Sequence, residues 1–125
     1  MVQLELLELN HTELIRLPDG ISNLTNITRL NLASVPLTEL PDDLADMTQL
    51  EALSLSGTHF DEFPTVILEL PNLISLNISF SGMTTIPPEI GNLTQLRYLI
   101  LNSTSIQELP PEIGLLESLV HLEIR

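Results

Sequence analysis

Apolar residues recur along this chain in a strict period of 23 residues, without an insertion or a deletion. Each period opens with a run of the form L-x-x-L-x-L, and these runs begin at Leu4, Ile27, Leu50, Leu73, Leu96 and Leu119. A hydrophobic pattern repeated at about 20 to 50 residues is typical of stacked supersecondary units that cannot bury their apolar faces alone. The sequence therefore predicts one solenoid domain over residues 1–125, with five full units and a partial sixth.

Within each unit the pattern predicts one short strand and one short return segment. The fourth and sixth positions, such as Leu30 and Leu32, alternate with polar or variable residues, which is the period of a half-buried strand. Proline fills the fifteenth position of every full unit, where its fixed φ and missing N–H group favour the start of the return segment. Acidic residues that follow, such as Asp42 and Glu89, suit the first turn of a short α or 3₁₀ helix.

The unit resembles that of the leucine-rich repeat family, L-x-x-L-x-L-x-x-N/C-x-L, over essentially the whole chain. Its L-P-x-x-I/L half is similar to the class found in intracellular Ras-binding proteins, plant resistance receptors and bacterial proteins. The resemblance implies an α/β fold in the form of a right-handed horseshoe segment. A parallel β-sheet is then expected on the concave face, and short α or 3₁₀ turns on the convex face.

One position departs from the family pattern in every unit. The slot of the family's asparagine, which bonds the backbone of the turn after the strand, holds Thr12, Val35, Thr58, Ser81 and Thr104. A hydroxyl can satisfy part of this backbone demand, whereas Val35 can satisfy none. We therefore expect the Val35 turn to bond to its own backbone or to water.

The outward side of the strands is the expected binding surface, because curvature aligns one side chain per unit in parallel columns. Small residues dominate its middle, and Phe80, Tyr98 and Ile100 stand out against them. We expect these three to be exposed on adjacent units about 4.8 Å apart and to form one apolar patch. Scattered surface residues without a role are the alternative interpretation.

Polar and basic residues extend the candidate site. Arg97 precedes Tyr98, Arg29 lies towards the N-terminal side, and aromatic residues with a nearby arginine are typical of interface hot spots. A shallow groove beside the patch, able to supply hydrogen bonds, is expected from Ser54, Ser56, Ser75, Asn77 and Ser79. The predicted partner-binding residues are Phe80, Tyr98, Ile100, Arg29, Asn31, Asn77, Arg97 and Ser54.

Charge excludes one class of partner. The chain has 17 acidic residues against four arginines, for a net charge of −13, and nucleic acid binding needs a basic stripe instead. The acids fall mainly on the turns and the convex back, so the strand side is expected to be nearly neutral. We interpret the acidic back as a solvated face, with an electrostatic docking surface as the alternative.

Catalytic chemistry has no support in the sequence. His11, His59 and His121 fall in different units and columns, so they cannot share a metal ion or a proton. Acidic pairs such as Asp42 and Asp43 fall on turns, where solvated carboxylates are expected. No P-loop, nucleophile elbow or glycine-rich fingerprint occurs. We therefore expect no enzymatic activity, no cofactor and no metal site.

The chain carries no cysteine, no apolar stretch long enough for a membrane span and no signal-peptide pattern. It does contain six N-x-S/T sequons, at Asn10, Asn23, Asn26, Asn77, Asn92 and Asn102. They would be glycan acceptors in a secreted eukaryotic protein, but a repeat rich in Asn, Ser and Thr also generates them by composition. The sequence predicts a cytoplasmic protein without a membrane partner.

The favoured function is a recognition module that binds a protein or peptide on its concave face, within a larger signalling or sensing protein. The alternative is a scaffold or spacer whose contacts lie at its ends. Met1 fills a slot held elsewhere by Leu24 or Leu70, so the sequence begins within a repeat and shows no polar terminal unit. We expect a fragment of a larger protein, or ends that associate between molecules.

Overall fold

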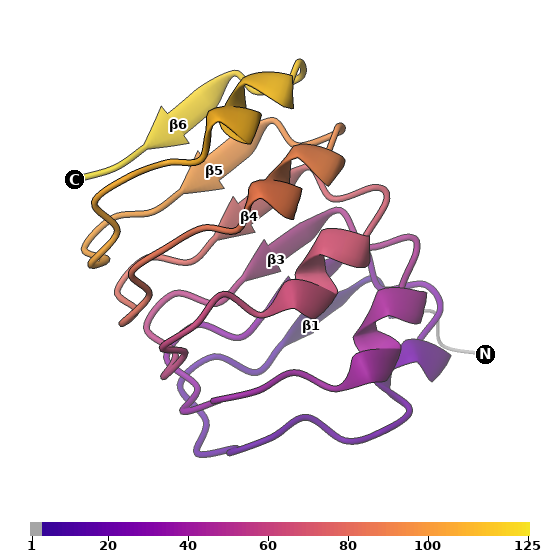
Figure 1. The fold of residues 1–125 in the computed structure, drawn as a ribbon. Coiled ribbons are helices and arrows are strands. Elements are labelled where there is room, and N and C mark those ends of the chain that lie inside the picture. Colours follow the sequence, from indigo (N-terminus) through magenta and orange to yellow (C-terminus); the bar gives the residue numbers. More distant parts are fainter. Residues whose placement is uncertain (1–3) are drawn as a thin grey trace.

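Six three-residue strands, one from each repeat, form a single parallel sheet in chain order. The computed structural model describes residues 4–125, so Met1 and the slot predicted for it lie outside the described residues. The strands run along one side of the stack and the return turns along the other (Figure 1). The strands are β1 Leu6–Glu8, β2 Arg29–Asn31, β3 Ala52–Ser54, β4 Ser75–Asn77, β5 Tyr98–Ile100 and β6 His121–Glu123.

The register of the sheet follows directly from the repeat length. Leu7 pairs with Leu30, and Leu30 in turn pairs with Leu53, each one period further along the chain. The same parallel register continues through Leu76, Leu99 and the last strand. The predicted parallel sheet with one strand per unit is confirmed.

Each strand returns through a short 3₁₀ helix on the opposite side of the core. These turns are η1 Ile21–Asn23, η2 Asp42–Asp46, η3 Thr65–Glu69, η4 Pro88–Asn92 and η5 Pro111–Leu115. An extended proline precedes each of the last four turns, such as Pro41 before η2. The sequence left an α or a 3₁₀ turn open, and within residues 4–125 the structure shows only the tighter form, as is common for connections of this length.

The core lies between the sheet and the turns. Leu53 and Leu76 enter it from the strands, and Leu44, Ile67 and Ile90 enter it from the turns; all five are at most 2% exposed. Leucine and isoleucine form most of the core, which also contains Val35, Met47 and Met83, and Phe60 and Phe63 are its aromatic members. The outermost described units contribute residues that are only partly buried, such as Leu9 and Leu119.

At the position of the family's asparagine, hydroxyl side chains form hydrogen bonds with the backbone of the turn, as the sequence predicted. The Thr58 hydroxyl donates to the carbonyl of Leu55 at 2.7 Å, and Thr12, Ser81 and Thr104 make the equivalent bond in their units. Val35 has no such group, and only its backbone N–H donates to the Leu32 carbonyl, at 3.3 Å, a bond that the Thr58 N–H also makes to Leu55. The turn after β2 thus closes on its own backbone, and the completely buried Val35 side chain joins the core.

The preceding position turns the chain out of the strand. His11, Ser34, Gly57, Phe80 and Ser103 all have positive φ, between 54° and 73°. This left-handed conformation is easy only for glycine, because a Cβ approaches the following carbonyl group. The sequence placed this eighth position on the open strand side, and the structure shows that it belongs to a sharp turn at the end of that side.

Candidate partner-binding site

The outward side chains of the six strands form a surface that we call the strand face. It consists of Leu6, Glu8, Arg29, Asn31, Ala52, Ser54, Ser75, Asn77, Tyr98, Ile100, His121 and Glu123. The parallel register aligns these residues in two columns across the strands, with about 4.8 Å between neighbours in a column. Side chains from different repeats can therefore contact one ligand together.

A hollow of about 300 Å³ lies on the strand face over β1 to β4. Small side chains at Ala52, Ser54 and Ser75 make its floor low, while longer side chains stand around it. We call it the polar hollow; it is lined by Leu6, Glu8, Arg29, Leu30, Asn31, Ala52, Leu53, Ser54, Ser75 and Asn77. The hollow brings together four of the predicted binding residues: Arg29, Asn31, Ser54 and Asn77.

The two asparagines of the hollow are held by their own turns. The Asn31 Oδ1 accepts a hydrogen bond from the Ala33 N–H at 3.0 Å, and the Asn77 Oδ1 accepts one from the Ser79 N–H at the same distance. Because an N–H group must face the amide oxygen, each Nδ2 is turned the other way. Neither Nδ2 donates to another described residue, and neither is a buried unsatisfied atom. Both amides therefore keep free donors in fixed positions.

The predicted groove of serines is shorter than the sequence suggested. Ser79 is only 2% exposed, and its Oγ accepts the Asn102 N–H at 3.0 Å while its own N–H is held by Asn77. Its hydroxyl lies beneath the surface and is not open to a partner. Ser54 and Ser75 remain half-buried at the floor of the polar hollow.

A second group of residues, which we call the Tyr98 cluster, lies on β5 and β6. The Arg97 guanidinium carbon lies 5.8 Å from the centre of the Tyr98 ring, and the His121 ring lies 6.5 Å from it. Tyr98 is 40% exposed. An arginine over an aromatic ring is a favourable cation–π arrangement, worth about 0.5 to 1 kcal/mol at an exposed site.

The positions of Phe80 and Ile100 differ from the single exposed patch that the sequence predicted. Phe80 is 63% exposed, but it lies on the positive-φ turn after β4, where its N–H donates to the Asn102 carbonyl. Tyr98 pairs with Ser75 at the start of β4, whereas Phe80 follows the end of β4, so the two aromatic residues lie at different places along the strand direction. Ile100 is half-buried and not exposed. The two aromatic residues are thus separate points at opposite ends of the strand direction.

A carboxylate network at β6 had no signal in the repeat pattern. The Asn102 Nδ2 donates to the Glu123 Oε1 at 2.8 Å, the His121 Nε2 lies 3.0 Å from Oε2, and the Arg125 Nε lies 3.3 Å from Oε1. The hydrogen bonds from His121 and Asn102 hold the pKa of Glu123 below its ordinary value, although partial desolvation opposes them. Only the one-period register, which places Asn102 beside Arg125 and its neighbours, could have indicated this group in advance.

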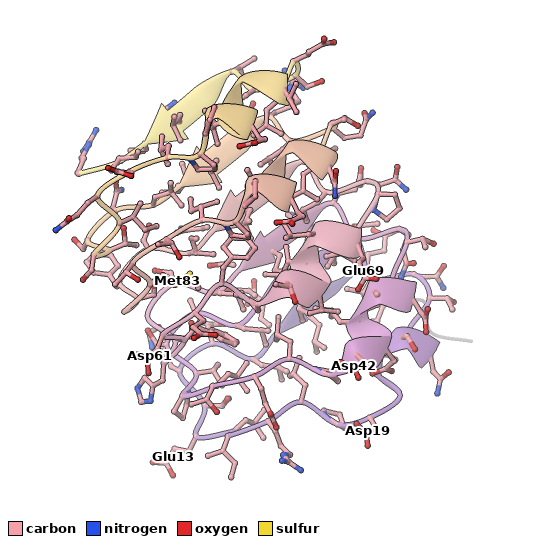
Figure 2. All side chains as sticks on the ribbon, viewed as in Figure 1. Glu13, Asp19, Asp42, Asp61, Glu69 and Met83 are labelled. Carbon is pink, nitrogen blue, oxygen red and sulfur yellow. The ribbon has the colours of Figure 1, made fainter. Side chains whose placement is uncertain are left out.

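The acidic residues keep away from the strand face for the most part. Figure 2 shows Glu13 and Asp61 on the loops at one side of the stack, and Asp42 and Glu69 on the turns η2 and η3. Within residues 4–125 no three His, Cys, Asp or Glu residues come close enough to hold a metal ion. In the same range no helix is long and apolar enough to cross a membrane.

Comparison with known proteins gives the class of this chain. The Leucine Rich Repeat family model matches residues 72–93, and solved structures of leucine-rich repeat proteins match nearly the whole stack. Together with the period and the sheet, these matches show that the chain is a leucine-rich repeat protein. Curated protein sequences give no match.

Three similar structures show the range of these proteins. An internalin (inlF) from Listeria monocytogenes is 25% identical over 83% of this chain, with a TM-score of 0.71. The plant peptide hormone receptor RGFR1, in complex with RGF2, is 32% identical over 90% of this chain, with a TM-score of 0.72. The Arabidopsis receptor kinase HAESA, in complex with the peptide hormone IDA and the co-receptor SERK1, is 28% identical over 85%, with a TM-score of 0.73.

All three relatives are much longer than the matched segment. The chain spans 29% of the internalin, 18% of RGFR1 and 19% of HAESA. The likeness therefore concerns a run of repeats and not the whole of any of these proteins.

Proposed function

We propose that this chain is a recognition module that binds a protein or a peptide on its strand face. The polar hollow is the observation that carries the proposal, because it combines space on the sheet with fixed, unused amide donors at Asn31 and Asn77. Tyr98, which pairs with Ser75 of the hollow, and Phe80, on the turn after β4, add exposed aromatic surface, and such residues are enriched in protein interfaces.

The similar structures support a partner of this kind. Two of them are plant receptors described in complex with RGF2 or with a peptide hormone. Because the chain spans less than a third of each relative, the proposal places it within a larger sensing or signalling protein. It assigns recognition to the described residues and no catalysis.

Site-specific photo-crosslinking in the natural host tests the surface. A photoreactive benzoylphenylalanine in place of Ser75, on the floor of the hollow, should give a product of higher mass that contains the partner. The same group in place of Glu69, exposed on η3 at the convex side, is the matched control and should give none. Crosslinks from Glu69 but not from Ser75 would contradict binding on the strand face.

A double substitution and the positions of crosslinks separate recognition from the scaffold alternative. Replacing Phe80 and Tyr98 together by alanine should lower partner affinity, and unchanged affinity would show that these two residues are wrongly assigned. The scaffold alternative predicts instead that crosslinks come only from the two ends, Leu4 to Leu9 and Leu119 to Ile124, where exposed apolar side chains such as Leu4 and Ile124 lie. End-to-end self-association stays a prediction, which a monodisperse monomer in light scattering would contradict.

We also propose that the protein works in the cytoplasm. Asn23, Asn26 and Asn92 are exposed, so glycosyltransferases would reach these sequons if the chain passed through a eukaryotic secretory pathway. The expectation is therefore no mass change when protein from its natural source is treated with a glycosidase. A loss of glycan mass would overturn the proposed location and leave the binding surface unaffected.

A further inference from the structure

Arg29 is the one arginine for which the described residues provide no partner. Arg16 pairs with Glu39 at 3.1 Å, Arg125 pairs with Glu123 at 3.3 Å, and Arg97 lies over the Tyr98 ring. Arg29 is exposed at the margin of the polar hollow and forms no ion pair within residues 4–125. In a chain with 17 acidic residues, an arginine left without a carboxylate on the strand face is a notable exception.

We propose that the polar hollow is a subsite for a side-chain carboxylate on an extended peptide segment. This proposal rests on the proposed function, because it requires that a peptide chain binds the strand face. The Arg29 guanidinium would bind the carboxylate, since its planar fork of N–H groups matches two carboxylate oxygens. Glu8 also lines the hollow, and its charge opposes an incoming carboxylate, so only an acid placed directly on the Arg29 guanidinium is favoured there.

The fixed amides suit the backbone of the same segment. Asn31 and Asn77 occupy equivalent positions on β2 and β4, two strands apart, which corresponds to about 9.6 Å. Three residues of a polyproline II chain advance about 9.3 Å and return to the same orientation. Two carbonyl groups three residues apart can therefore accept one hydrogen bond from each Nδ2, while the segment runs across the strands.

The occupant is an internal acidic residue and not a chain terminus. Arg29 lies on the second strand of the hollow, and only Leu6 and Glu8 line it on the β1 side. The lining of the hollow extends to both sides of Arg29, to Leu6 and Glu8 on β1 and to Ser75 and Asn77 on β4, so a chain can continue past Arg29 in both directions. A terminal carboxylate would leave half of this path empty.

Selection from a random linear peptide library displayed on phage, with the folded chain as the target, tests the proposal. The enriched peptides should share an aspartate or glutamate, and synthetic versions with an amidated C-terminus should still bind. Changing that acid to its amide should weaken binding about tenfold, and Arg29→Ala should do the same. The two changes together should cost no more than either alone, because they remove one interaction.

Arg16→Ala is the matched control, because it removes the same charge from the paired, exposed arginine outside the strand face. It should leave peptide affinity unchanged. Arg29→Glu should reject the selected peptide and accept its version with lysine in place of the acid. Binding that ignores Arg29, or that requires a free C-terminus, would overturn the carboxylate subsite.

Ser54→Tyr distinguishes the failure of this inference from the failure of the proposed function. The new side chain would fill the middle of the polar hollow, and circular dichroism would verify that the variant folds. Peptides lost on Ser54→Tyr but unaffected by Arg29→Ala would contradict only the carboxylate subsite. Peptides that bind Ser54→Tyr normally, or a library that yields no peptide dependent on the hollow, would contradict both.

Discussion

The eighth residue of each unit must adopt a positive φ because the same turn recurs in every repeat, and this strains every residue there except glycine. The turn demands positive φ, and only Gly57 meets this demand without strain, at φ 73°. A Cβ added there would also approach the Ser34 Oγ to 3.3 Å. Gly57→Ala should therefore destabilise the protein by about 1 to 2 kcal/mol in chemical denaturation. An alanine variant as stable as the native chain would show that the turn relaxes.

Phe80→Gly provides the reciprocal control at the equivalent position. Phe80 is a bulky residue at φ 56° and is mostly exposed, so glycine would remove strain while sacrificing little packing. The gain is reduced because glycine has more freedom in the unfolded chain. We expect a net increase of about 0.5 to 1 kcal/mol. An exposed residue that costs stability in this way is consistent with the surface role proposed for Phe80.

At the scale of elements, alanine is expected to have opposite effects on stability at two glycines in equivalent positions of successive turns. Gly91 of η4 is buried, and a Cβ there would lie 3.0 Å from the Leu115 Cδ1 and 3.3 Å from the Glu112 carbonyl of η5. Gly114 occupies the same position in η5 and has nothing within 4 Å. Gly91→Ala should lower the melting temperature by several degrees, because η5 must shift away from η4.

Gly114→Ala is the control for helix propensity alone. It adds the same methyl group to the same kind of turn without a clash, so stability should be unchanged or higher by up to about 1 kcal/mol. If both variants were destabilised equally, the contact between η4 and η5 would not be the cause. The comparison thus isolates packing between successive turns from the properties of one turn.

The sequence predicted most of these elements because the period specifies them. One L-x-x-L-x-L run supplies both the alternation of a strand and its register with the next unit, and the proline places the return turn. The sharp turn at Phe80 was not predicted, because the eighth position holds serine, histidine and phenylalanine as well as glycine, and this mixture of residue types does not indicate a positive φ. The placement of Phe80 and Tyr98 in one patch failed for that reason.

Contacts between units were harder to predict than the units themselves. Asp43 accepts hydrogen bonds from the Gly20 N–H at 2.9 Å and the Ser22 hydroxyl at 3.0 Å, which joins η1 to η2. Desolvation raises the pKa of Asp43, but the bonds from Ser22 and Gly20 outweigh it and lower the pKa. In the sequence Asp43 looked like an ordinary solvated acid on a turn, because side-chain direction does not follow from the repeat pattern. The same holds for the locked amides of Asn31 and Asn77.

At the scale of the whole molecule, the net charge of −13 opposes folding. The described residues form only a few ion pairs, and most carboxylates lie on the turns and loops without a basic neighbour. The compact state brings these charges closer together than the unfolded chain does, so their repulsion destabilises it. Because the acids are exposed, dissolved salt can screen them. The response of stability to salt therefore reports the repulsion between charges across the whole stack and not the packing of any one repeat.

The melting temperature should therefore rise as sodium chloride increases from about 0.01 M to 0.1 M, while the screening length falls from about 30 Å to 10 Å. Most of the increase should occur within this range, because at about 0.1 M the repulsion between exposed charges more than about 10 Å apart is already largely screened. Sucrose raises stability by exclusion from the surface and not by screening, so it should not change the size of the salt effect. A variant with several convex acids changed to their amides, such as Glu69→Gln with Asp42→Asn, should show a smaller increase. A melting temperature that falls with salt would mean that attractive ion pairs outweigh repulsion between the acids.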